Sequence, residues 1–156
     1  MDSEFSEMMN RLSENARFAL QKADLFSKKY NNGYMGTEHI LLGILAQDVS
    51  VGAKVLSSYG VTLEKAEKAL GQEASEVNGN SSMAMMSLSE AAVLTIRMAS
   101  HYTIERGVET IGTEYLLYAL LCQPNSRGAM LLKKMGVDND DVQNALEAGM
   151  DAQVRI

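Results

Sequence analysis

The chain of 156 residues lacks several features that mark whole classes of proteins. It has one proline and one cysteine, and its net charge is −6 rather than positive. A lone cysteine cannot form an internal disulfide, so we expect a reducing compartment, the cytoplasm. The acidic balance disfavours nucleic acid and anionic membranes as partners, because both bind basic surfaces.

Membrane and nucleotide signals are also missing from the sequence. No apolar run approaches the ~20 residues that a membrane-spanning helix needs, and the first residues, MDSEFSEMMN, carry acids instead of the basic start of a signal peptide. The phosphate-binding pattern G-x-x-x-x-G-K-[ST] does not occur, so ATP cannot bind by that route. His101 and Cys122 stand alone without ligand-like spacing, so we expect no metal and no cofactor.

What the sequence does contain is one pattern that occurs twice. Leu12-Ser13-Glu14 returns as Leu88-Ser89-Glu90, and Gly36-Thr37-Glu38 returns as Gly112-Thr113-Glu114. The offset is constant (112 − 36 = 76), and about a third of the paired positions are identical without any gap. Preserved spacing implies preserved helix and loop lengths. Any site built from the repeated residues should therefore occur twice, related by approximate symmetry.

Helical periodicity dominates both copies. Apolar residues recur at spacings of three and four, with serine or threonine before the runs and glycine after several of them. The pattern predicts helices over 14–30, 37–45, 50–59 and 63–70, and again over 89–104, 113–121, 126–135 and 138–146. Four short helices alone bury too small a core, so the two copies should pack face to face. We expect an all-α fold, one eight-helix globule made of two tandem four-helix repeats with pseudo-twofold symmetry.

The domain organisation follows from the same repeat. We expect residues 1–156 to form a single domain, with repeat one at about 11–70 and repeat two at about 87–146. Residues 71–86 are rich in Gly, Asn and Ser and are expected to be a flexible linker. The tail, 147–156, is predicted as either a frayed helix end or the start of a further linker.

Several of these motifs resemble the Clp N-terminal repeat domain, and the ClpC-type AAA+ unfoldases above all. The resemblance rests on Gly36-Thr37-Glu38-His39-Ile40-Leu41-Leu42-Gly43, on Arg11–Ala16 before it, and on Gly52-Ala53 with Tyr59-Gly60-Val61 after it. It covers about residues 5–147. The second copy departs from the family pattern, because Tyr115 stands where the family repeats histidine, and Tyr118-Ala119 replace Leu-Gly.

The resemblance implies a domain that has no catalytic activity itself. Such a domain receives unfolded protein substrates or adaptor proteins for a hexameric AAA+ unfoldase ring and its peptidase. In the ClpC branch the resemblance also implies a receptor for phosphoarginine on proteins marked for degradation. The family's acidic residue, here Glu38 and Glu114, would take the guanidinium, and the hydroxyls of Ser13 and Ser89 would lie near the phosphoryl group.

The chemistry of phosphoarginine fits these residue types. A planar guanidinium pairs with a carboxylate, and phosphoryl oxygens accept hydrogen bonds from the free N–H groups of a helix N-terminus. Each copy offers both kinds of group, since a Thr-Glu pair opens one of its helices and a serine opens another. The predicted binding residues are Ser13, Thr37, Glu38, Ser89, Thr113 and Glu114. Sequence alone does not say whether these helix starts meet in space.

Other interpretations stay open at this point. Thr followed by Glu is a common arrangement at a helix start, with no ligand involved. A ClpB- or ClpA-like domain would bind unfolded segments or an adaptor without phosphoarginine. A small helical enzyme could use Glu38 and His39 as acid and base, although the replacement of His39 by Tyr115 in the second copy argues against it.

Overall fold

The computed structural model describes residues 3–30, 33–74 and 87–154, and these residues form nine α-helices. Helix α1 spans Ser3–Asn10 and precedes both repeats. The helices of the first repeat are α2 (Glu14–Lys29), α3 (Thr37–Ala46), α4 (Val51–Ser58) and α5 (Leu63–Ala74). Those of the second are α6 (Glu90–Arg106), α7 (Thr113–Leu121), α8 (Arg127–Lys134) and α9 (Asn139–Val154).

Serine caps set the starts of four of these helices. The hydroxyls of Ser13, Ser50, Ser89 and Ser126 each accept a hydrogen bond from the backbone N–H three residues further on. This contact satisfies one of the donors that a helix start leaves unpaired. Gly60, Gly107 and Gly136 follow helices with positive φ, a conformation that glycine adopts without steric cost. The boundaries of α4 and α8 are therefore set by matching local residues.

The all-α class is confirmed, and the two repeats show the same order of four helices. The sequence pattern predicts eight helices and none before residue 13, whereas the structure has a further helix, α1, in that segment. Phe5 of α1 is buried, so the helix is held by an apolar contact as well as by its own backbone. The last helix of each repeat runs well past its expected end. α5 continues to Ala74 and α9 to Val154, while residues 75–86 of the expected linker lie outside the described residues.

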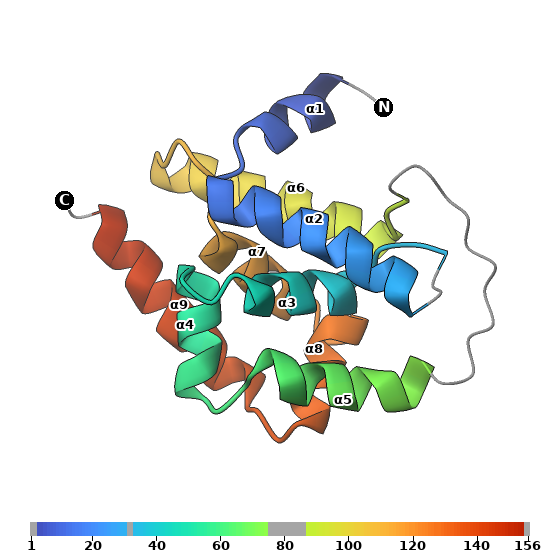
Figure 1. The fold of residues 1–156 in the computed structure, drawn as a ribbon. Helices are drawn as coiled ribbons and strands as arrows, with labels where there is room; N and C mark the ends of the chain where they lie inside the picture. Colours follow the sequence, from blue (N-terminus) through green and yellow to red (C-terminus); the bar gives the residue numbers. More distant parts are fainter. Residues whose placement is uncertain (1–2, 31–32, 75–86, 155–156) are drawn as a thin grey trace.

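Helices of each repeat pack against helices of the other repeat. α3 packs against α2 and α5 of its own repeat and against α8 of the other, and α7 packs against α6 and α9 as well as α4 of the first repeat. Figure 1 shows α3 and α7 in the middle of the molecule, with α2 and α6 above them and α5 and α8 below. All ten positions of α3 except Ala46 are buried. Both repeats therefore contribute to one hydrophobic core.

Two short backbone pairings also join the repeats. Leu12 pairs with Ile111 and Met35 pairs with Leu88 as isolated parallel bridges, and the offset of the repeat converts one pair into the other. The N–H of Ser13 donates to Ile111 O at 2.9 Å, and the N–H of Ser89 donates to Met35 O at 3.0 Å. Each bridge places the start of the first helix of one repeat beside the Gly-Thr-Glu motif of the other.

Among the residues that the structure describes, no single helix is long and apolar enough to cross a membrane. α3 and α4 pass that test only when taken together, and they are bent by 93° relative to each other.

Candidate functional site

The six predicted site residues line two hollows, and each hollow combines residues from both repeats. The first, of about 380 Å³, is lined by Ser13 and Ser50 of repeat one and by Thr113 and Glu114 of repeat two. The second, of about 200 Å³, has the inverse composition: Thr37 and Glu38 from repeat one, with Ser89 and Ser126 from repeat two. We call them the Glu114 hollow and the Glu38 hollow.

The predicted helix starts do meet, but across the repeats. Ser13 lies with Glu114 and Ser89 lies with Glu38, whereas the sequence had offered each serine only as part of its own copy. The bridges at Leu12 and Met35 explain the crossing, because each connects one repeat's serine helix to the other repeat's glutamate helix. Either hollow therefore requires both repeats.

Thr37 and Thr113 tie the helices of each hollow together. The Thr113 hydroxyl accepts a hydrogen bond from the N–H of Gly52 at 2.9 Å, and the Thr37 hydroxyl accepts one from Gly128 at 2.8 Å. Both threonines are buried. Their hydroxyls are thus placed to hold the N-termini of α4 and α8 against α7 and α3, in addition to any role toward a ligand.

The glycine of each Gly-Thr-Glu motif makes room for the glutamate side chain. A Cβ added at Gly36 or Gly112 would collide with the carboxylate of Glu38 or Glu114, which folds back over the first turn of its own helix. A carboxylate is favoured there by the partial positive charge of the helix N-terminus. The two glutamates are 2% and 8% exposed, so each carboxylate forms part of the floor of its hollow.

Three helix N-termini surround each hollow. Around the Glu114 hollow these are the starts of α2, α4 and α7, and around the Glu38 hollow they are the starts of α6, α8 and α3. The first N–H groups of a helix have no carbonyl partner within the helix, and the dipole of the helix start favours an anion. Here the serine caps and the hydroxyls of Thr37 and Thr113 take up some of these N–H groups. A buried carboxylate beside several helix N-termini can receive a cationic guanidinium and an anionic phosphoryl group at the same time.

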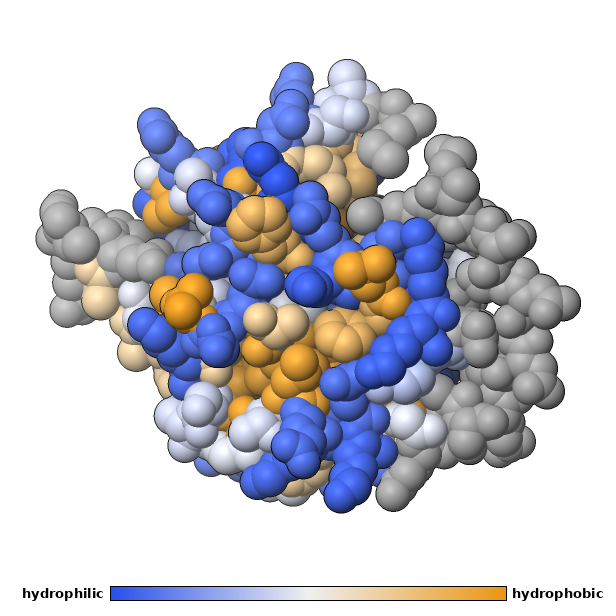
Figure 2. All heavy atoms as spheres, viewed as in Figure 1, coloured by the Kyte–Doolittle hydropathy of each residue, from blue (hydrophilic) through white to orange (hydrophobic). Residues whose placement is uncertain are grey.

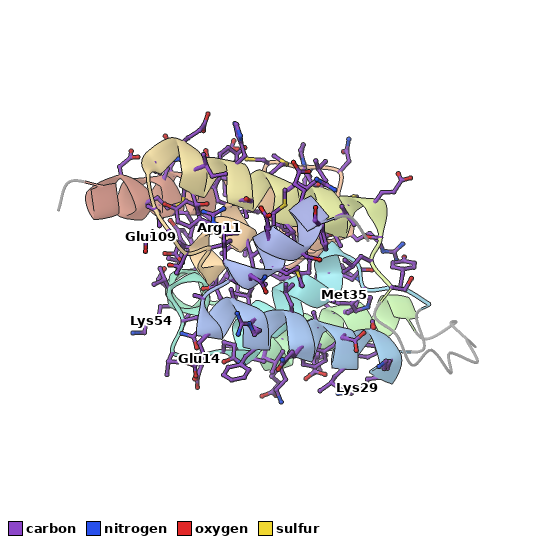
Figure 3. All side chains as sticks on the ribbon, turned by 90° about the horizontal axis from the view of Figure 1, so that it is seen from above. Arg11, Glu14, Lys29, Met35, Lys54 and Glu109 are labelled. Atoms are coloured by element: carbon purple, nitrogen blue, oxygen red, sulfur yellow. The ribbon has the colours of Figure 1, made fainter. Side chains whose placement is uncertain are left out.

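Arg11 fixes one wall of the Glu114 hollow. Its Nε donates to the carbonyl of Glu109 at 3.2 Å, and Figure 3 labels both residues. Its other two nitrogens donate to the hydroxyls of Ser100 and Thr103 at 2.9 and 2.7 Å. The bond to Glu109, with another to the carbonyl of Val108 at 3.2 Å, holds the segment before α7, and Val108 and Thr110 of this segment line the hollow. Arg11 belongs to repeat one, so this wall also depends on both repeats.

Arg127 makes the two hollows different. Its Nε lies 3.0 Å from Oε2 of Glu38, and the Glu38 side chain is 3% exposed whereas that of Arg127 is 63% exposed. The matching position of repeat one is Val51, at the start of α4. Sequence reasoning missed Arg127. The signal that could have found it was this mismatch inside the otherwise repeated Ser-x-Gly-Ala motif.

His39 is part of the packing at the start of α3. It is fully buried, and its Nδ1 accepts a hydrogen bond from the N–H of Gly36 at 2.9 Å. Burial, with a smaller contribution from the nearby Arg127 cation, lowers the pKa of His39 to about 4, so the ring is neutral at pH 7. Its partner position, Tyr115, is also buried. These contacts favour a structural role for His39 over the acid–base role.

Within the described parts of the chain, no group of three His, Cys, Asp or Glu side chains is placed to hold a metal ion.

The protein is thus an all-helical repeat domain. Two copies of one four-helix unit pack against each other, and a hollow lies at each place where they meet. The chain belongs to the Clp repeat (R) N-terminal domain family, whose model matches residues 11–109 and 87–156.

The comparisons with individual proteins agree with that family. The chloroplastic chaperone protein ClpC2 of Oryza sativa subsp. japonica is 28% identical over 141 residues, which cover 87% of this chain and 15% of the relative. The N-terminal domain of ClpD from Arabidopsis thaliana has a similar fold, with a TM-score of 0.77, 23% identity, and coverage of 90% of this chain and 98% of that one.

A ClpV N-domain solved in complex with a VipB peptide has a TM-score of 0.67 and 15% identity, covering 92% of this chain and 89% of that chain. The chain thus matches solved N-domains over nearly their whole length, but spans about 15% of the length of the curated relatives.

Proposed function

We propose that this domain docks substrate or adaptor proteins for a ClpC-type AAA+ unfoldase and its peptidase in regulated proteolysis, and that it recognises phosphoarginine on marked proteins. The domain itself would carry no catalytic activity. The family assignment and the ClpC relatives support the docking role, and the ClpV N-domain with its VipB peptide is an example of peptide binding by this fold.

One observation carries the phosphoarginine part of the proposal. Each hollow has a buried carboxylate, Glu38 or Glu114, beside three helix N-termini. At Glu38 the carboxylate already pairs with a guanidinium, that of Arg127, at 3.0 Å. The groups needed for the two charged ends of phosphoarginine therefore lie next to each other in both hollows.

Calorimetric titration with free phosphoarginine tests this function. We expect the wild-type chain to bind it, and the double variant Glu38→Ala/Glu114→Ala to lose nearly all binding. Removing a carboxylate that holds a guanidinium costs ~1.5–3 kcal/mol, or roughly one to two decades in affinity at each site. Unmodified arginine should bind far more weakly, because it leaves the N–H groups of the helix starts unfilled.

Glu64→Ala is the matched control for that titration. Glu64 is an exposed acid in the first turn of α5 and lines neither hollow. Its loss removes a carboxylate favoured by a helix dipole without touching a hollow, so binding should stay unchanged. If wild type does not bind phosphoarginine, or the double variant binds as well as wild type, the receptor role is refuted.

A specific observation also favours the alternative of docking apolar segments without phosphoarginine. Phe18 and Leu25 of α2 are 41% and 57% exposed. Figure 2 shows apolar residues between hydrophilic ones on the face of the molecule that it draws. Exposed apolar side chains can contact an unfolded segment. Under this alternative, Leu25→Ser would weaken peptide binding and the two glutamates would not matter.

A further inference from the structure

We infer that the two hollows differ in their affinity for phosphoarginine, because Arg127 competes with the guanidinium of the ligand for the carboxylate of Glu38. This inference rests on the proposed recognition of phosphoarginine and concerns the regulation of those same sites. The Glu114 hollow is then the primary binding site, and the Glu38 hollow takes a ligand only when the side chain of Arg127 is displaced.

The backbone around Arg127 holds it over Glu38. Its neighbour Ser126 caps α8, and the next residue, Gly128, donates its N–H to the hydroxyl of Thr37 at 2.8 Å. Thr37 directly precedes Glu38 in α3. Residue 127 is thus held beside the glutamate on both sides, and its Nε reaches Oε2 of Glu38 at 3.0 Å.

The corresponding backbone at the other hollow is built in the same way. Ser50 caps α4, and Gly52 donates its N–H to Thr113 at 2.9 Å, directly before Glu114. The residue between them is Val51, which is 48% exposed and has no charge or hydrogen-bonding group. The difference between the hollows at this position is therefore one side chain on a shared backbone.

The sizes of the hollows agree with this difference. The Glu38 hollow, which Arg127 lines, has about 200 Å³, and the Glu114 hollow, which Val51 lines, has about 380 Å³. A ligand that enters at Glu38 must find space and also replace an existing charge-assisted contact with the same carboxylate.

Arg127 is a competitor rather than a fixed wall. Its side chain is 63% exposed, so its guanidinium can move into water while the guanidinium of the ligand takes its place on the buried carboxylate of Glu38. Because one charge-assisted contact must be given up for another, we expect phosphoarginine to bind the Glu38 hollow about tenfold more weakly than the Glu114 hollow. A substrate with one mark would use the Glu114 hollow, and a substrate with several marks would also engage the second.

Exchanging the two matched residues tests the inference directly. The variant Arg127→Val gives the Glu38 hollow the residue of the other copy, and Val51→Arg does the reverse. In titrations with free phosphoarginine, wild type should show one tight and one roughly tenfold weaker site. Arg127→Val should show two sites of similar, tight affinity. Val51→Arg should show two weak sites.

The backbone amide signals of Gly36 and Gly112 in NMR titrations assign each site to its hollow, since these glycines line the Glu38 and Glu114 hollows respectively. In wild type the Gly112 signal should respond at lower ligand concentration than the Gly36 signal. In Arg127→Val the two should respond together. Both variants place at one helix start a residue that the other copy already tolerates there, and thermal unfolding verifies that they fold.

Three outcomes have distinct meanings. If wild type binds two equivalents with equal affinity, the inequality is refuted and the proposed function stands. If Arg127→Val loses binding at Gly36, Arg127 is a phosphate ligand instead of a competitor, which also refutes the inference. If neither wild type nor any variant binds phosphoarginine, the proposed function itself fails, and the inference fails with it.

Discussion

At the scale of the residue, the buried side chain of His39 makes the stability of the fold depend on pH. His39 is fully buried and accepts a hydrogen bond from Gly36 through Nδ1, so its proton is on Nε2. Burial lowers its pKa from 6.5 to about 4. In the unfolded chain the ring gains a proton as the pH falls through 6.5, whereas in the folded chain it stays neutral down to about 4. The free energy of unfolding therefore falls as the pH drops from 6.5 to about 4, because only the unfolded chain takes up the proton in this range.

The variant His39→Gln tests this dependence, because glutamine offers an acceptor to Gly36 and does not titrate. We expect the free energy of unfolding of wild type, relative to the variant, to be constant above pH 6.5. It should fall by up to about 3 kcal/mol as the pH drops from 6.5 to 4. Urea denaturation at several pH values measures the difference, in which the carboxylates common to both chains cancel. A difference that does not change with pH would contradict the expectation.

At the scale of the element, α3 and α7 are matched helices that pack differently. A Cβ at Gly43 of α3 would collide with the carbonyl oxygen of Ala19 in α2. The corresponding residue of α7 is Ala119, which is itself buried. The backbones of α2 and α3 therefore approach each other more closely at this point than a side chain would allow.

Gly43→Ala should consequently destabilise the protein, although alanine is the better helix former. The clash is with backbone and cannot be relieved by a rotamer change, so we expect a net loss of about 1–3 kcal/mol. Gly149→Ala in α9 is the control, because a Cβ there meets nothing within 4 Å. The free energy of unfolding of that variant should rise by up to about 1 kcal/mol, because alanine is the better helix former. Thermal and urea unfolding of both variants decides, and a stabilised Gly43→Ala would show that the helices can move apart.

At the scale of the whole molecule, neither repeat is complete without the other. α8 covers α3, α4 covers α7, and buried residues of both repeats belong to one hydrophobic cluster. Each hollow has one wall from each repeat. We therefore expect the protein to unfold in a single cooperative transition.

A fragment of residues 1–74 should show no cooperative unfolding, because α3 would expose the surface that α8 covers. The fragment is helical only to the extent that its isolated helices are, which is little for helices of this length. Circular dichroism during urea titration measures this. Mixing the fragment with residues 75–156 should restore a cooperative transition. A fragment that unfolds cooperatively at the same urea concentration as the full chain would show that a repeat folds alone.

The helices and their repetition could be read from the sequence because their signals are local. The Ser13, Ser50, Ser89 and Ser126 caps act on residues only three positions away, and the glycine stops act through their own φ. α7 has the predicted bounds. α1 was missed because it has only eight residues and owes its stability to burial of Phe5, which no local pattern reveals.

The sequence by itself determined the helical class, the duplication and the residue types that line the hollows. Only the tertiary structure decided that Ser13 faces Glu114, that Ser89 faces Glu38, and that Arg127 lies on Glu38. The physical reason is the distance along the chain. These contacts join residues on different repeats, and they form only when helix packing and the two backbone bridges bring the repeats together. Repeated motifs specify each half of a site, and the packing of the repeats specifies which halves meet.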